Sequence, residues 1–343
     1  MKKSVKTALA IAVVLIVTGM LLVAAAFLRG ASVRDIWNNA SVNMNLVSPG
    51  YGDLKGYTVC KTGEESFSPD EVKHIDLSWI SGTVKLQPGG EGRITLKERS
   101  EKPLKDEQKL CWKLEKGTLS IHFCSALQTQ MPDKDLVLSV PSDWTAENLT
   151  VAATSADVEL RELQVEKALE LTATSGDVQL FDCRCDKLDA GATSGSVALQ
   201  GCECRAMALG STSGSLQAEA CRCDTLEGST TSGSICVGAE AKSIKLGSTS
   251  GPICCEQIPA GCDVSLGSTS GTVKLQLKDT SDRQRIKIET TSGDVFLDVP
   301  GAIDLDYDTA SGDMSGRLEQ GGSGCPTVKV DTTSGDLILG AFR

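Results

Sequence analysis

A Ser-Gly pair that recurs at a nearly constant interval constrains the fold of this chain more than any other feature. Successive serines lie 18 to 23 residues apart, and an earlier copy, Ser155-Ala156, has alanine in place of glycine. The glycines of the repeated pairs are Gly176, Gly195, Gly214, Gly233, Gly251, Gly271, Gly293, Gly312 and Gly335. Tandem repetition at a short period is typical of solenoids, in which each repeat packs on its neighbours.

Each Ser-Gly pair stands between two apolar stretches that alternate with polar residues. Val178 and Leu180 follow one pair, and Leu169 and Leu171 precede it. Period-two alternation indicates β-strands with one buried face. We therefore predict an all-β protein, built as a parallel β-solenoid of about ten 19-residue coils that stack about 4.8 Å apart. We expect the glycine at each corner to supply a positive φ.

The N-terminal segment predicts a transmembrane helix. Residues 7–28 carry no charge, and as a helix they would be about 33 Å long, enough to cross a bilayer. Three lysines within residues 1–6 place this tail in the cytoplasm and the bulk of the chain outside. We expect a single-pass protein of the cell membrane. A signal peptide cut near Ala24-Ala25-Ala26 is the alternative.

The rest of the chain divides by its pattern. Residues 29–70 are irregular and rich in turn signals, and we interpret them as a stalk or linker. Residues 71–150 are strand-like but lack the 19-residue period, which predicts a β cap that closes the edge of the solenoid. Residues 151–343 hold the repeats.

Composition argues against several classes of function. The formal net charge of −11 disfavours a nucleic-acid partner, because phosphate binding needs an excess of Lys and Arg. The two histidines, His74 and His122, provide little material for a catalytic triad or a histidine-rich metal site. Aromatic residues make up 4% of the chain, which fits a narrow aliphatic interior. We expect neither catalysis nor a cofactor.

The chain resembles the bacterial putative-adhesin β-strand-repeat family, a large family of unknown function that is similar in appearance to bactofilins and to head-GIN-type adhesin domains. The resemblance rests on the segments IDLSWISGTVKL, ITLKERSE, CWKLEKGTLSIHF and DLVLSVPSDW, followed by serial corners such as TSGDV. It covers roughly residues 70–340. It implies a membrane-anchored or secreted envelope protein and supplies no catalytic residues.

Aspartates after some Ser-Gly pairs are the candidates for a metal site. Asp294, Asp313 and Asp336 occupy this position in coils near the C-terminus, and stacked carboxylates can bind Ca²⁺. The Gly-Gly-x-Gly-x-Asp calcium repeat is absent, however. Because Asp also favours turns, we interpret these residues as corner residues and predict no metal.

Cysteine is the most individual feature of the chain, with 14 copies. The pattern Cys-x-Cys occurs in three successive coils, and a charged middle residue must face water, so both cysteines should face inward. The predicted columns are Cys183, Cys202, Cys221 and Cys185, Cys204, Cys223. We expect reduced thiols there, acting as small buried apolar groups. Cys236 and Cys254 should point outward on adjacent coils, and we predict either a disulfide or a reactive site there.

Three functions follow as hypotheses. The favoured one is a non-enzymatic adhesin-like or scaffolding protein, anchored by residues 7–28, whose partners are surface polysaccharide or envelope proteins. The alternative is a membrane-tethered sensor or regulator of envelope stress. A polysaccharide-active β-helix enzyme is the least favoured, because such enzymes build clefts from long inserted loops and the coil length here hardly varies. The pattern leaves self-association open.

Overall fold

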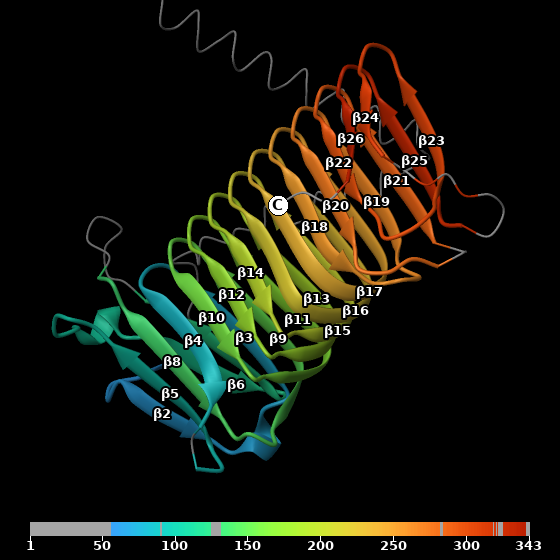
Figure 1. The fold of residues 1–343 in the computed structure, drawn as a ribbon. Coiled ribbons are helices and arrows are strands. Elements are labelled where there is room, and N and C mark those ends of the chain that lie inside the picture. Colours follow the sequence, from blue (N-terminus) through green and yellow to red (C-terminus); the bar gives the residue numbers. More distant parts are fainter. Residues whose placement is uncertain are drawn as a thin grey trace, which may run out of the picture. The chain divides into compact units, whose positions relative to one another are not determined.

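The computed structural model describes residues 56–89, 91–124, 132–281, 284–317, 319, 321 and 325–340, which all belong to one compact unit. The predicted tail and membrane helix, residues 1–6 and 7–28, lie outside these ranges, as does most of the predicted stalk. Within the described ranges, no helix is both long and apolar enough to cross a bilayer. The described part of the chain is all-β, and its centre is a parallel β-solenoid of about nine turns (Figure 1).

The strands before the first repeat are β1 (Thr58–Val59), β2 (Glu64–Phe67), β3 (His74–Trp79), β4 (Thr83–Pro88), β5 (Ile94–Arg99), β6 (Cys111–Glu115), β7 (Thr118–His122) and β8 (Asp135–Val140). Two short 3₁₀ turns, η1 (Pro69–Glu71) and η2 (Asp106–Gln108), interrupt them.

The strands of the repeats are β9 (Thr145–Ala153), β10 (Asp157–Arg161), β11 (Gln164–Ala173), β12 (Val178–Phe181), β13 (Arg184–Ala192), β14 (Val197–Gln200), β15 (Glu203–Ser211), β16 (Leu216–Thr230), β17 (Ile235–Ser248), β18 (Ile253–Ile258), β19 (Asp263–Ser268), β20 (Val273–Leu277), β21 (Arg285–Thr290), β22 (Val295–Asp298), β23 (Asp304–Thr309), β24 (Met314–Gly316), β25 (Thr327–Thr332) and β26 (Leu337–Leu339).

Equivalent positions of successive repeats pair in register. Val158 of β10 lies beside Val178 of β12, and Val178 lies beside Val197 of β14. The alternating residues face inward as predicted: Val178 and Leu180 are fully buried, and so are Leu169 and Leu171 on the strand before the corner. The core therefore fills the space between the strands that precede and follow each corner.

The stack begins earlier than the predicted boundary at residue 151. β3 pairs in parallel with β9, and β4 pairs in parallel with β10, so parallel stacking already begins inside the segment that we interpreted as the cap. The connection between β3 and β4 contains Ser81-Gly82, a further Ser-Gly pair. On the side away from the repeats, β7 pairs in parallel with β3, and β8 pairs in parallel with β4. Antiparallel strands then extend the sheets: β5 pairs with β8, β2 with β5, β6 with β7, and β1 with β6.

At the other end, the coils do not stack in chain order. β25 lies between β21 and β23, and β26 lies between β22 and β24. The last repeat is thus inserted before the penultimate one, whose strands form the outer edge. The residues of β23 alternate between exposed and half-buried, and Met314 of β24 is 56% exposed. The polar sequence of this coil suits an edge without a neighbour.

The corner glycines differ from prediction in one respect. None of the nine has a positive φ, so the expected conformational role is wrong. They are instead required by close stacking: a Cβ on any of them would lie 1.8–2.1 Å from a corner carbonyl oxygen of the adjacent coil. In glycine, a Cα hydrogen occupies the position of the Cβ and points at this carbonyl oxygen. This is the arrangement of a Cα–H···O contact.

The exceptional corner residue Ala156 has a local explanation. The carbonyl oxygen of Gly82, in the coil beside it, accepts a hydrogen bond from the Asp157 amide at 3.1 Å. In the next coil, the Asp177 amide donates instead to the side chain of Asp157. The Gly82 carbonyl is therefore directed at an amide rather than at the corner Cα, and a methyl group can be accommodated at Ala156.

Candidate functional site

The three candidate aspartates stack along the corner edge, and the carboxylates of two of them accept hydrogen bonds from backbone amides. The Asp336 amide donates to Asp294 Oδ1 at 3.0 Å, and the Asp313 amide donates to Asp336 Oδ1 at 2.9 Å. Their spatial order is 294, 336, 313 because the last repeat is inserted. Within the part of the chain that the structure describes, no group of acidic, histidine or cysteine side chains has a metal-binding arrangement. Asp294 and Asp336 therefore satisfy amides of the neighbouring coils.

Buried hydroxyls join adjacent corners at two places in the middle of the stack. Ser211 donates to the carbonyl oxygen of Gly195 at 3.1 Å and accepts from the amide of Gly214 at 2.9 Å. Thr230 makes the same two bonds, one coil further on, to Gly214 and Gly233. Because a buried corner carbonyl or amide must be paired, these hydroxyls are structural.

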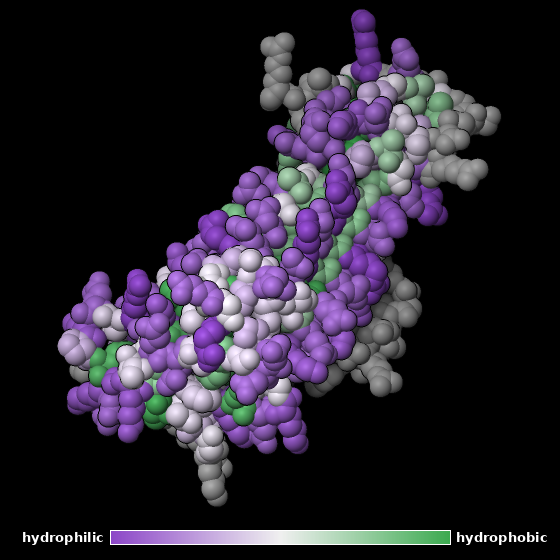
Figure 2. Space-filling view, turned by 90° about the horizontal axis from the view of Figure 1, so that it is seen from below, coloured by the Kyte–Doolittle hydropathy of each residue, from purple (hydrophilic) through white to green (hydrophobic). Residues whose placement is uncertain are grey.

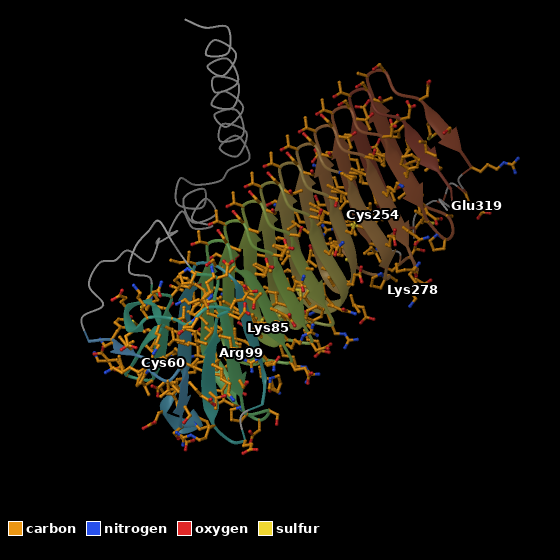
Figure 3. The ribbon with its side chains drawn as sticks, turned by 90° about the vertical axis from the view of Figure 1, so that its left-hand side faces the viewer. Cys60, Lys85, Arg99, Cys254, Lys278 and Glu319 are labelled. Carbon is orange, nitrogen blue, oxygen red and sulfur yellow. The ribbon has the colours of Figure 1, made fainter. Side chains whose placement is uncertain are left out.

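Exposed threonines follow the same edge. A threonine directly precedes the serine of most corners, and we call seven successive ones the threonine row: Thr174, Thr193, Thr212, Thr231, Thr249, Thr269 and Thr291. All of them are exposed or half-buried. Figure 3 shows the resulting regular series of oxygen-tipped side chains along the corners of the coils. Parallel strands place equivalent side chains about 4.8 Å apart.

The six cysteines of the Cys-x-Cys pairs face the interior, as predicted, with one partial exception. Cys183, Cys202 and Cys221 are at most 1% exposed, and Cys204 and Cys223 are also buried. Cys185 is half-buried. Burial raises the pKa of the Cys223 thiol to about 11, because the interior disfavours the thiolate.

Cys236 and Cys254, the predicted disulfide, lie side by side in register on β17 and β18. Both are half-buried free thiols, and Cys254 contacts Glu256 Oε1 at 3.2 Å. Figure 3 shows Cys254 in the middle of the stack. Burial, followed by the hydrogen bond to Glu256, raises the pKa of Cys254 to about 12. The pair is correctly placed, but its thiols resist ionisation; the disulfide stays a prediction.

Two columns of alternating charge cover the Cys-x-Cys strands. We call them the charge ladders: Arg184, Glu203, Arg222, Glu240 in one and Asp186, Arg205, Asp224, Lys242 in the other. Glu203 bridges its two arginine neighbours, at 3.2 Å from Arg184 and 3.5 Å from Arg222. Figure 2 shows hydrophilic side chains over most of one face of the coils. We did not predict these ladders, although charges that alternate in sign from coil to coil were their signal.

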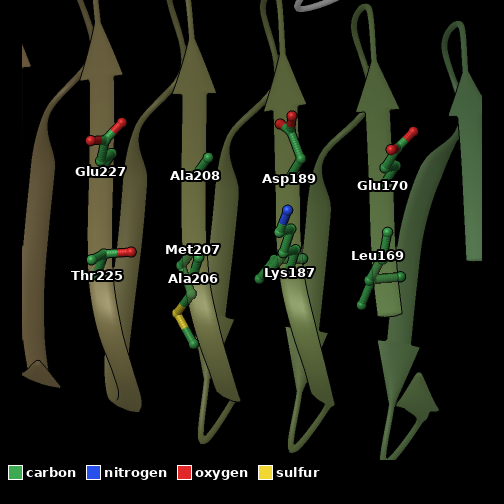
Figure 4. A pocket seen from close by; sticks show the side chains of 11 residues that line it. Leu169, Glu170, Lys187, Asp189, Ala206, Met207, Ala208, Thr225 and Glu227 are labelled. Carbon is green, nitrogen blue, oxygen red and sulfur yellow. The ribbon is translucent and has the colours of Figure 1, made fainter. Parts of the chain in front are cut away.

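A shallow hollow of 280 Å³ lies on the strands between the ladders and the corner edge (Figure 4). Its carboxylates include Asp189 of β13 and Glu227 of β16, and the small side chain of Ala208 lies on the strand between them. Partial loss of hydration and the nearby Glu170 raise the pKa of Asp189. Two carboxylates on either side of a gap could in principle serve acid–base chemistry, so this hollow is where an enzymatic function would be tested.

Comparison with known proteins identifies one matching family model. A family model described as Toastrack DUF4097 matches residues 72–339. No curated protein sequence matches the chain.

Several solved structures are similar at low identity. A putative adhesin from Parabacteroides merdae is 12% identical, with a TM-score of 0.46, over 81% of this chain and 95% of that chain. A putative adhesin from Bacteroides fragilis is 14% identical, with a TM-score of 0.41, over 80% and 95%. A putative lipid binding protein from Parabacteroides distasonis is 12% identical, with a TM-score of 0.40, over 80% and 95%.

Proposed function

The chain belongs to the Toastrack DUF4097 family, and on that premise we propose that it is a non-enzymatic, adhesin-like protein of the cell envelope. In this proposal, residues 7–28 anchor it in the membrane and the coils bind surface polysaccharide or an envelope protein outside the cell. The uncharged segment and the lysines before it support the anchor. The alternative, a membrane-tethered sensor of envelope stress, stays a prediction.

The threonine row is the observation that carries the proposal. From Thr193 to Thr291 it places a threonine at the same position of successive coils on the corner edge, whereas the Thr174 hydroxyl is buried. The corners beneath the row are held by backbone stacking and by hydrogen bonds such as those of Ser211. A rigid series of equivalent groups can contact a repeating polymer at several points at once. Each weak contact then adds to the others without the entropic cost of a new encounter.

Cosedimentation with isolated cell envelopes tests the binding function. The full chain should sediment with envelopes, and Thr212→Val with Thr231→Val should reduce the bound fraction because hydroxyl groups are lost at nearly constant side-chain volume. The matched control changes two exposed residues that follow the corners, Gln179→Ala and Gln217→Ala. The envelopes are also treated with protease before binding. Binding that survives this treatment indicates a polysaccharide partner, and binding that is lost indicates a protein partner. Equal binding by the two double variants would contradict the role of the row.

A second assay tests the non-enzymatic assignment. Incubation of the full chain with cell-wall polysaccharides should release no oligosaccharide. Release that disappears with Asp189→Asn or Glu227→Gln, in the hollow of Figure 4, would overturn the assignment.

Protease accessibility tests the topology. Protease added to intact cells should remove nearly all of the mass beyond residue 30, and full protection of the chain would contradict the proposed anchor.

A further inference from the structure

A second hollow brings three cysteines together beneath the charge ladders. It has a volume of 360 Å³ and spans three neighbouring coils of the stack. Its walls contain Cys185, Cys204 and Cys223. Four ladder residues form the rest of the lining: Glu203, Arg205, Arg222 and Asp224. The hollow is therefore a surface site where sulfur atoms lie next to fixed charges of both signs.

Two of these sulfur atoms are in direct contact. Cys185 and Cys204 are in register on β13 and β15, and their Sγ atoms are 2.7 Å apart. A disulfide bond is about 2.05 Å long, and it tolerates Cα separations of about 4.4–6.8 Å, which include the spacing of paired strands. Little movement therefore separates this pair of thiols from a disulfide.

We propose that this hollow is a thiol–disulfide exchange site, in which a small disulfide that carries both ammonium and carboxylate groups oxidises Cys185 and Cys204. The Cys185 thiolate attacks one sulfur of the disulfide, forms a mixed disulfide and releases one thiolate. The Cys204 sulfur then attacks the Cys185 sulfur and releases the second thiolate. The two cysteine protons and two electrons pass to the released thiols, and the Cys185–Cys204 bond remains.

The order of the two steps follows from exposure and protonation. Cys185 is half-buried, whereas Cys204 is 6% exposed, so an incoming disulfide can reach Cys185 first. The hydrogen bond between the two sulfurs and burial both raise the pKa of Cys204. Cys204 therefore remains a thiol until the mixed disulfide is beside it, and it acts as the resolving cysteine.

The ladder residues determine the class of partner. Two basic and two acidic side chains line the hollow, and Arg222 already lies 3.5 Å from Glu203. The same side chains also pair with other ladder residues, as Arg205 does with Asp186 and Asp224 with Lys242. Because these ion pairs are solvent-exposed and individually weak, they can exchange partners with the ammonium and carboxylate groups of a ligand. A zwitterionic peptide disulfide can pair with both the carboxylates and the guanidinium groups of the hollow, whereas an uncharged disulfide can form no ion pair with either.

Oxidised glutathione is the probe. The reduced full chain is incubated with it, quenched in acid, alkylated and mapped by mass spectrometry. We expect a Cys185–Cys204 disulfide to form before any at Cys236 and Cys254, an in-register pair that lies outside the hollow. Cys204→Ser should stop the reaction at a glutathione adduct on Cys185, and Cys185→Ser should leave Cys204 unmodified. Circular dichroism of each variant checks that the coils remain folded.

Two results would overturn the proposal. One is a Cys236–Cys254 disulfide while Cys185 and Cys204 still alkylate as free thiols in the folded chain. The other is a folded Cys204→Ser variant that accumulates no adduct on Cys185. Equal oxidation rates with oxidised glutathione and with the uncharged 2-hydroxyethyl disulfide would contradict the zwitterionic class of partner.

Discussion

The strands before the repeats and the repeated coils are stabilised in different ways. Around β3 to β8, the core contains large aromatic side chains and a buried ion pair between Lys134 and Glu98, in which the Nζ and Oε1 atoms are 2.8 Å apart. In the coils, the interior consists mainly of Val, Ile, Leu and Cys, and every corner repeats the same contacts. The strands around β3 to β8 are therefore stabilised by individual interactions that occur once. The coils are stabilised by one kind of contact that recurs at successive corners.

This difference predicts different responses to substitution. In a solenoid, each coil contacts only its neighbours, so a defect should remain local. In the N-terminal strands, by contrast, distant segments converge on Lys134: its ammonium group donates to the carbonyl oxygens of Gln108 and Cys124 and lies over the ring of Phe123. A defect there should loosen several strands at once.

The largest effect is expected for Lys134→Met. Lys134 and Glu98 have side chains that are 0% and 1% exposed, and removal of the lysine leaves an uncompensated buried carboxylate. The free energy of unfolding should fall by about 3–5 kcal/mol, as measured by denaturant unfolding.

The matched control removes both charges. Glu98→Gln added to Lys134→Met keeps an acceptor for the Leu110 amide, which donates to the Glu98 carboxylate. The double variant should recover most of the loss, because well-packed neutral groups often replace a buried ion pair at little cost. A double variant that is as unstable as the single one would show that the charge balance is unimportant.

Gly214→Ala is expected to have an intermediate effect. The new Cβ would lie 1.9 Å from the Gly195 carbonyl oxygen, so the two coils must separate locally, at a cost of about 1–3 kcal/mol. Gly210→Ala is the control, since a Cβ there meets no atom within 4 Å and its φ is not positive. This control should be neutral or stabilise by up to about 1 kcal/mol. Similar melting temperatures for both variants would refute the stacking role of the corner glycine.

The smallest effect concerns a surface contact between coils. The hydrogen bond from Arg285 lowers the pKa of Asp263 in the folded chain. The ionised carboxylate therefore stabilises the fold above the unfolded pKa of about 3.9, and this contribution is lost as the pH falls through the lower folded pKa. Because the Asp263 side chain is 34% exposed, Asp263→Asn should cost less than about 1 kcal/mol at neutral pH. Denaturant unfolding across pH should show this cost shrinking toward acid; a cost that grows there would be inconsistent.

The repeat architecture could be predicted because every coil carries the same local signal. The Ser-Gly pair and alternating residues such as Val178 and Leu180 are sufficient to predict the strands and their register. The inward direction of the Cys-x-Cys pairs followed from the same alternation. The position of Ser81-Gly82 at a corner of the stack was missed because this copy lies outside the regular period.

The remaining features depend on contacts that a sequence pattern does not contain. The role of the corner glycines arises from the distance between the backbones of two coils, whereas the local signal suggested a special φ. The insertion of β25 and β26 depends on which coil can remain exposed; the polar residues Asp304, Asp306 and Asp308 were its sequence signal. Lys134 belongs to no periodic pattern, and only the folded chain brings it to Glu98.

Amide hydrogen exchange of the full-length chain tests most directly whether the repeats are held coil by coil. In Gly214→Ala, the account predicts faster exchange in the coils on either side of that corner, from β14 to β17, with β3 to β8 unchanged, and no such change in Gly210→Ala. Faster exchange spread evenly over both regions, or identical exchange in the two glycine variants, would contradict it.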